Sequence, residues 1–301
     1  MTPTQGKAFV FNIEALQKDL FEQILIRNGM SADEIAKLKP EDLAWDYTRI
    51  SLLAKSIYMD EGELATLVNE ASKGNFKQFI TDPTNPHGKA NLETKTRFEE
   101  LGLDYAKWQT GPEAQTFKIG GQEYTVKLWN RVPQESLFDG SYTTCCTALD
   151  GGNGGSMANY MLNTAINVVE VKDKNGKVVA MSRCYIADVG GKQTFVIENI
   201  EANNQLIARM TDNGTTANLV EGLHNYLKDF ATEVGGEDMP VYMSTSFAKV
   251  SYPFKDNFKA VQKPVKLTGE ISKNQIYLNT YCGYVDANNL TKPAEFYIVR
   301  E

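Results

Sequence analysis

Residues 167–202 carry the pattern that most constrains the fold. Three runs rich in β-branched and aromatic residues (NVVEVKD, KVVAMSRCYIADV and KQTFVIENIEA) follow one another, separated by two short turns. The turns contain Asn175-Gly176 and Gly190-Gly191, and such pairs suit the positive φ angles of tight hairpins. The pattern therefore predicts three consecutive antiparallel strands, that is, a β-meander.

Other elements surround this meander. Residues 114–131 alternate on either side of Gly120 and Gly121, which predicts a β-hairpin. A short helix is expected at 156–165, and the amphipathic run 213–236 predicts a long helix that ends at glycines. Further short strands are expected in the runs MPVYMST, IYLNTYCGYVDA and AEFYIVR.

The N-terminal part has a different character. In residues 11–29 the apolar side chains recur at helical spacing, and Ser31 with Glu34 has the capping-box pattern of a helix start. Residues 81–94, with two prolines and a glycine, are predicted to be a loop, and residues 92–111 return to a helical pattern. We therefore expect an α+β protein, with an α-helical region at 1–112 and a mixed α/β domain at 113–301 around a central, mostly antiparallel sheet.

Charge limits the classes of partner. The net charge is −7, and no dense block of lysine and arginine occurs, so neither nucleic acid nor an anionic membrane is expected to bind. No apolar run approaches the roughly 20 residues of a membrane span, and no basic segment followed by an apolar run opens the chain. We expect a cytoplasmic protein, whose helical N-terminal region is a candidate surface for a protein partner.

Residues 142–157, YTTCCTALDGGNGGSM, place two adjacent cysteines before a glycine-rich run and a predicted helix. One interpretation is a nucleophilic thiolate, Cys145 or Cys146, at a helix start, with His224 as its base. The other is a pair of buried thiols that act as small apolar side chains beside a turn. With two histidines and no CxxC spacing, the chain lacks the usual pattern of a zinc site.

The end of the run TFVIENIEA is acidic. Glu198, Glu201 and Asp188 could supply a general base and its partner, or a site for a hard cation. Simple alternation places Glu198 on one face of the strand, beside Val196 and Ile200, and Glu201 on the other face. A carboxylate beside two β-branched residues would be partly removed from water, which suits a general base.

From residue 120 onward, the order of elements resembles that of the GNAT superfamily of N-acetyltransferases. In that fold a β-meander leads into a central strand, and the sheet splays after this strand. Acyl-CoA lies with its pyrophosphate at the start of the following helix, where backbone N–H groups favour negative charge. The resemblance implies transfer of an acyl group from acetyl-CoA, or another acyl-CoA, to an amine.

The resemblance also implies roles for individual residues. The run TFVIENIEA corresponds to the central strand, which makes Glu198 the base for the amine. SFAKVSYPFKDNF is similar to the segment whose tyrosine protonates the leaving thiolate, which makes Tyr252 the acid. The loop before the long helix lacks the arginine or glutamine usual in the family. The pyrophosphate would lie against Gly214, Thr215, Thr216 and Ala217.

Two other classes of function stay open at this point. A hydrolase or acyltransferase could use Cys145 or Cys146 as nucleophile. Alternatively, the fold could serve as a GNAT-like binding module without catalysis, which the altered pyrophosphate loop favours.

Overall fold

The computed structural model describes seven stretches of the chain and six single residues. These are residues 76–131, 136, 139–143, 145, 147, 156–189, 191–213, 215–244, 264–266 and 295–301, with Ser31, Asp33 and Lys37. The helices predicted before residue 76 and the strand predicted at 276–287 lie outside the described residues. The chain divides into two compact units, Met1–Lys89 with Asn130–Leu162, and Ala90–Trp129 with Asn163–Glu301. The expected boundary at residue 112 stays a prediction.

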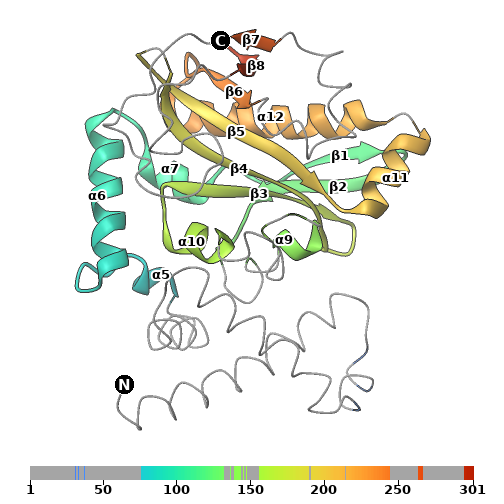
Figure 1. Ribbon diagram of the computed structural model, residues 1–301, viewed down its shortest axis with the longest axis horizontal. Helices are drawn as coiled ribbons and strands as arrows, with labels where there is room; N and C mark the ends of the chain where they lie inside the picture. Colours follow the sequence, from blue (N-terminus) through green and yellow to red (C-terminus); the bar gives the residue numbers. More distant parts are fainter. Residues whose placement is uncertain are drawn as a thin grey trace. The chain divides into compact units, whose positions relative to one another are not determined.

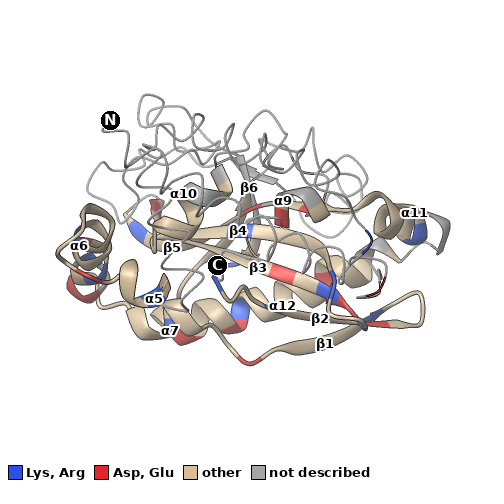
Figure 2. Cartoon of the chain, turned by 90° about the horizontal axis from the view of Figure 1, so that it is seen from below, with Lys and Arg blue, Asp and Glu red and all other residues tan. Residues whose placement is uncertain are grey.

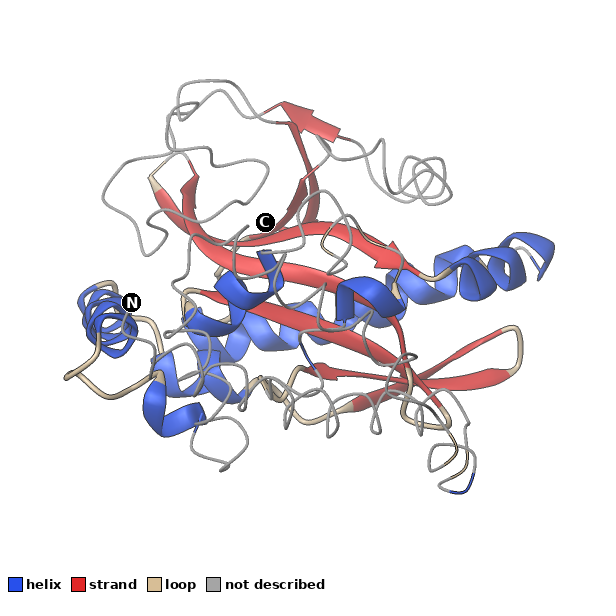
Figure 3. Ribbon diagram, turned by 60° about the horizontal axis from the view of Figure 1, so that its bottom comes forward, coloured by secondary structure: helices blue, strands red, loops and turns tan. Residues whose placement is uncertain are grey.

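The second unit is built on a strongly curled sheet of mixed type (Figures 1 and 3). Its order is β1-β2-β3-β4-β5-β6-β8-β7, in which β5 and β6 are parallel and every other described neighbouring pair is antiparallel. The strands are β1 (Gln115–Ile119), β2 (Gln122–Leu128), β3 (Ile166–Asp173), β4 (Val178–Val189), β5 (Lys192–Ala202), β6 (Val241–Ser244), β7 (Pro264–Lys266) and β8 (Glu295–Arg300). The predicted hairpin and meander are confirmed, and the fold is α+β.

Glycine allows the tight turns between these strands. Gly120, Gly121, Gly176 and Gly191 all have φ between 55° and 86°, a region that side chains with a Cβ rarely adopt. The turn pairs recognised in the sequence therefore determine where each hairpin reverses.

Helices lie between and beside the strands. They are α5 (Phe76–Phe79), α6 (Pro86–Glu100), α7 (Tyr105–Thr110), α9 (Asp139–Tyr142), α10 (Ser156–Leu162), α11 (Asn204–Asn213) and α12 (Thr216–Gly235). Helix α12, the long helix predicted from the sequence, packs along one face of the sheet (Figure 1). At Gly222 it approaches β1 so closely that a Cβ atom would lie 2.6 Å from the Phe117 ring.

An aromatic cluster fills the core between α12 and the sheet. The ring centroid of Phe230 lies 5.2 Å from that of Phe195 and 5.4 Å from that of Trp108. On the same face, the Tyr226 hydroxyl accepts a hydrogen bond from the backbone N–H of Leu128 at 2.7 Å. Burial raises the pKa of Tyr226 well above its ordinary value of 10.0. The helix face that the 3.6-residue period predicted is thus the face that is buried.

A buried polar network joins α6 and α7 to the start of β3. Thr164 donates its backbone N–H to the Asn91 side chain at 2.9 Å, and its carbonyl accepts from Trp108 Nε1 at 2.7 Å. Asn167 Nδ2 donates to the Trp108 carbonyl, and its Oδ1 accepts from Trp129 Nε1. A buried polar group without a hydrogen-bond partner costs about 1–3 kcal/mol of stability, and these bonds avoid that cost. They make residues 90–111 an integral part of the second unit.

The sequence interpretation is wrong at two helices. Residues 86–94 were predicted to be a loop, yet α6 begins at Pro86, because proline fits the first position of a helix. Asn85 precedes it and accepts the backbone N–H of Gly88 at 2.8 Å, as an N-cap residue does. Residues 204–213, which had no predicted element, form α11.

The described part of the first unit includes α5, α9 and α10, and the prediction of a helix at α10 is confirmed. Arg131 has a positive φ of 50° and donates from Nη1 to the carbonyls of Tyr160 and Met161, at 2.5 and 3.0 Å. Tyr160 and Met161 directly precede Leu162, the last residue of α10, so Arg131 satisfies carbonyl acceptors at the end of this helix.

Candidate functional site

Charged side chains gather on the sheet face opposite α12. Cross-strand partners in an antiparallel pair point to the same face, and residues two apart along a strand do so as well. Applied from Arg183 outward, these two relations identify the charged side chains that share its face of the sheet. Figure 2 shows acidic and basic positions together on β3. The set comprises Lys127 of β2, Glu170 and Lys172 of β3, Arg183 of β4, and Glu198 and Glu201 of β5.

A β-bulge in β5 shapes this charged face. Ser182 pairs with Ile200 and Cys184 with Ile197, so two residues of β5 lie opposite the single residue Arg183. The extra residue changes the alternation beyond it. Glu201 pairs with Met181, on the same face as Arg183, and therefore shares a face with Glu198. The alternation drawn from the sequence, which separated the two glutamates, is wrong beyond the bulge.

Glu198 is held at both its backbone and its side chain by β4. Its Oε2 lies 2.5 Å from Nε of Arg183, and its carbonyl accepts from Ser182 Oγ at 3.1 Å. Both charged side chains are buried, Glu198 being 1% and Arg183 5% exposed. Among the described residues, none donates a hydrogen bond of good geometry to either carboxylate oxygen of Glu198. A buried carboxylate oxygen without a donor is costly, which points to a role beyond stability.

A second ion pair lies on the same face. Lys172 Nζ is 2.8 Å from Oε2 of Glu170, and the Glu170 side chain is almost completely buried. Lys127 of β2 lies opposite Glu170 of β3 in the strand register. The charged face therefore contains two neighbouring ion pairs, one of them on the central strands β4 and β5.

The sheet changes its pairing next to Glu198. Strand β6 pairs with β5 at Phe195, Val196 and Ile197, whereas β5 continues to Ala202. Within the described residues, Glu198 and the four residues after it thus have a neighbouring strand on the β4 side alone. The bulge therefore lies next to the last residue of β5 for which the parallel pairing is described.

The start of α12 carries the residues predicted to hold a pyrophosphate. Thr215 is the N-cap residue, but its side chain makes no capping bond, and its Oγ1 is buried without a hydrogen-bond partner among the described residues. Thr216 begins the helix, and Ala217 in its first turn is exposed. Gly214 lies outside the described residues, as does Tyr252.

The described cysteine of the adjacent pair is buried. Cys145 lies after α9, with its Sγ accepting from Thr147 Oγ1 at 3.2 Å. Helix α10 is described from Ser156 onward, and the role of Cys145 as a nucleophile stays a prediction. Cys146 is outside the described residues.

His224 lies in the interior of α12, as expected, and belongs to the second unit, whereas Cys145 belongs to the first. Burial lowers the pKa of His224 from 6.5 to about 4, and the nearby charge of Lys228 acts in the same direction. The imidazole is therefore neutral at neutral pH.

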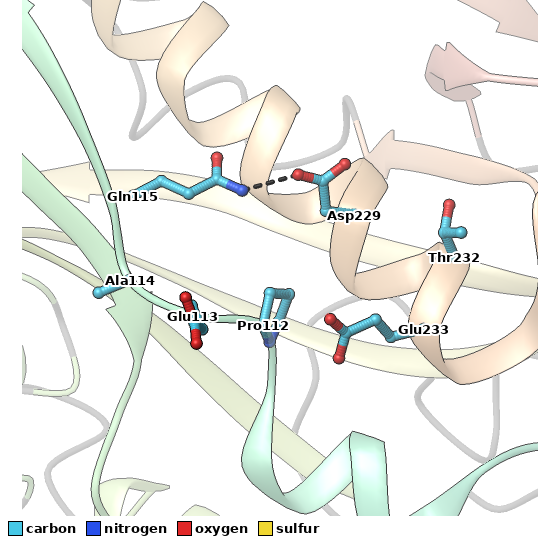
Figure 4. A pocket seen from close by; sticks show the side chains of 7 residues that line it. All are labelled: Pro112, Glu113, Ala114, Gln115, Asp229, Thr232 and Glu233. Carbon is cyan, nitrogen blue, oxygen red and sulfur yellow. Dashed lines mark hydrogen bonds between the residues drawn. The ribbon is translucent and has the colours of Figure 1, made fainter.

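An open pocket of about 570 Å³ lies on the α12 side of the second unit (Figure 4). Gln115 Nε2 donates to Asp229 at 2.7 Å, and Glu233 forms an ion pair with Lys107 at 3.3 Å. The lining residues are Pro112, Glu113, Ala114, Gln115, Asp229, Thr232 and Glu233. None of the site residues predicted from the sequence lines it. Throughout the described ranges, no three His, Cys, Asp or Glu side chains form a group that could hold a metal ion.

Sequence reasoning named Glu198 and Glu201 but missed Arg183, Glu170 and Lys172. The clue was available, because a charged residue inside a long apolar strand must find a partner when the strand is buried. Arg183 is the only charged residue in the first ten residues of β4. Its partner, however, depended on the bulge, for which the sequence carries no clear pattern.

Comparison with protein-family models and with curated proteins finds no match. In the part of the chain that the structure describes, no helix is both long and apolar enough to cross a bilayer.

Proposed function

We propose that this protein is an N-acyltransferase that uses acyl-CoA to acylate an amine. The observation that carries the proposal is the course of β5: a meander leads into it, and within the described residues its pairing with the parallel strand β6 reaches Ile197, the residue before Glu198. In the GNAT fold, which the order of elements resembles, the sheet splays at the corresponding point.

The start of α12 fits a phosphate group. The N-terminus of a 20-residue helix favours negative charge, and residues 214–220 include no acidic side chain. Thr215 Oγ1, buried and without a described partner, is a further donor for a phosphate oxygen. When bound, acyl-CoA supplies an activated thioester carbonyl.

Glu198 is the general base of this proposal. Its carboxylate would accept a proton from the acceptor nitrogen, which frees the nitrogen lone pair to attack the carbonyl carbon. As the carbon–nitrogen bond forms, the carbon–sulfur bond breaks, and Tyr252 would protonate the leaving thiolate. The contribution of a positioned base of this kind is about 10²–10⁴-fold in rate.

Thermal melting with and without millimolar acetyl-CoA tests the proposal. A ligand at about 100 times its Kd stabilises the folded state by about 2.7 kcal/mol, so we expect a clear rise in Tm. Ala217→Glu places a negative charge in the first turn of α12 and should abolish the rise, without harming the helix, because acidic residues suit that position.

Ala217→Gln is the matched control, since it adds similar volume without charge and should keep the rise in Tm. No rise in the parent protein would contradict the proposal. A rise that survives in Ala217→Glu would place the pyrophosphate away from α12. Glu198→Gln should keep acetyl-CoA binding and lose the release of free CoA thiol that a panel of primary amines stimulates.

A further inference from the structure

We infer that Ser182 is a positioning residue for Glu198: its hydroxyl holds the bulge of β5 that orients this glutamate on the charged face. The inference rests on the proposed function for the part that Glu198 takes in catalysis. The bulge and its hydrogen bond are features of the second unit alone.

The hydroxyl of Ser182 acts on the backbone of the bulge. Strand β5 places two residues, Glu198 and Asn199, opposite Arg183 alone. Such an extra residue interrupts the ladder of backbone hydrogen bonds locally. At this interruption Ser182 Oγ donates to the Glu198 carbonyl at 3.1 Å, and both residues are 1% exposed. Because a buried carbonyl that loses a donor is costly, the hydroxyl stabilises the bulged conformation of β5.

The bulge determines how the acidic side chains of β5 are presented. In a regular strand, residues three positions apart point to opposite faces. The extra residue brings Glu201 opposite Met181, and therefore onto the same face as Glu198. A bulge also bends its strand and changes the direction of the side chains within it, and Glu198 is one of the two residues in this bulge. The direction of Glu198 thus depends on the bulged conformation.

A second bulge provides a comparison. Val179 is the extra residue where β4 pairs with the end of β3. Its carbonyl accepts the backbone N–H of Asn203 at 2.9 Å, and the Asn203 side chain accepts the N–H of Leu206 at the start of α11. That bulge therefore serves the connection between β5 and α11. The bulge at Glu198 lies instead in the middle of the two longest described strands, where a side-chain hydroxyl holds it.

Kinetics of the full chain, with acetyl-CoA and the primary amine that the parent acylates fastest, test the inference. Ser182→Ala removes the hydroxyl, and we expect a several-fold lower kcat with an unchanged KM for acetyl-CoA, because the change affects the direction of Glu198. Ser182→Thr keeps a hydroxyl and should restore most of the parent kcat. Deleting Asn199 removes the bulge and should lower kcat by about 100-fold, as a displaced catalytic group does. Asn199→Ala keeps the bulge and is the matched control, with a kcat close to that of the parent.

Thermal unfolding without acetyl-CoA tests the hydrogen bond separately. Ser182→Ala should lower the Tm of the parent protein. It should lower the Tm of the Asn199 deletion clearly less, because a regular antiparallel ladder supplies the Glu198 carbonyl with a backbone donor. Equal losses of Tm in the two backgrounds would overturn the role of Ser182 in the bulge.

The two readouts separate failure of this inference from failure of the proposed function. A Tm that rises with acetyl-CoA, together with a parent-like kcat in Ser182→Ala, would refute the positioning alone. A parent Tm that does not rise would refute the proposed function, and the losses of Tm in the two backgrounds would still decide whether Ser182 holds the bulge. If the Asn199 deletion does not fold, the comparison of Ser182→Ala with Ser182→Thr carries the same prediction for kcat.

Discussion

The two faces of strands β3 to β5 are both buried, but they are built from different chemistry. On the α12 face, aromatic rings pack against one another, and the Tyr226 and Asn167 side chains bond to groups of the protein. On the opposite face, ion pairs replace rings, and neither carboxylate oxygen of Glu198 accepts a hydrogen bond from the described residues. The first face has the properties of a stabilising core, and the second carries the charged groups on which the proposed function rests.

The largest effect is expected on the α12 face. Phe230→Ala removes a completely buried ring that packs on Phe195 and Trp108, which should cost about 3–5 kcal/mol of the free energy of unfolding. Urea unfolding followed by circular dichroism measures this cost. Phe230→Leu, which keeps most of the apolar volume, should cost clearly less. Equal costs for the two variants would show that ring packing does not dominate this face.

Breaking the ion pair tests the opposite face. Arg183→Met leaves the buried Glu198 carboxylate without its cation and should lower the free energy of unfolding by about 3 kcal/mol. Adding Glu198→Leu should restore most of this loss, because an apolar pair of similar volume is often as stable as a buried ion pair. A double variant as unstable as the single one would mean that the pair is needed for the fold itself.

Protonation of His224, on helix α12, should make the stability of the protein depend on pH. Its pKa is about 4 in the folded protein against 6.5 as the ordinary value, so the unfolded chain binds more protons between these values. Stability is therefore full above about pH 6.5 and falls as the pH drops toward 4. Between about pH 7.5 and pH 5 the loss attributable to His224 is about 2 kcal/mol. Urea unfolding of His224→Gln at both pH values should show a correspondingly smaller loss, and an unchanged pH slope would contradict this assignment.

The smallest effect concerns the hydroxyl of Tyr226, which also donates to the Pro112 carbonyl at 3.3 Å. Tyr226→Phe leaves the buried Leu128 N–H without its acceptor at 2.7 Å, at an expected cost of about 1–2 kcal/mol. Thermal unfolding near neutral pH measures it, with Tyr242→Phe, at a half-buried position, as the comparison. A cost for Tyr226→Phe no greater than that of the control would indicate that water replaces the hydroxyl.

Much of the sheet could be predicted, because its turns have a local cause. Gly120, Gly121, Gly176 and Gly191 supply positive φ angles that few residues adopt, so the hairpins are visible in the sequence itself. Helix α12 was likewise visible from its apolar period. The start of α6 was missed because Pro86 was taken as a helix breaker, although proline suits a first turn.

The candidate site was predictable only in part. Glu198 attracted attention because it is acidic within an apolar strand, but its pairing with Arg183 depends on a register that long-range contacts determine. Cys145 attracted attention through its neighbour in sequence, whereas its surroundings are those of a buried thiol bonded to Thr147.

The bulge in β5 affects how relatives of this protein would align with it in sequence. Removing Asn199 would leave every other side chain of β5 on its present face, since regular alternation would then continue from Glu198 to Ile200. Relatives with and without this residue could therefore share one architecture while their aligned sequences differ by a gap inside a strand. Gaps are usually expected in loops, so kinship across this position would be easier to recognise from strand order than from residue identity.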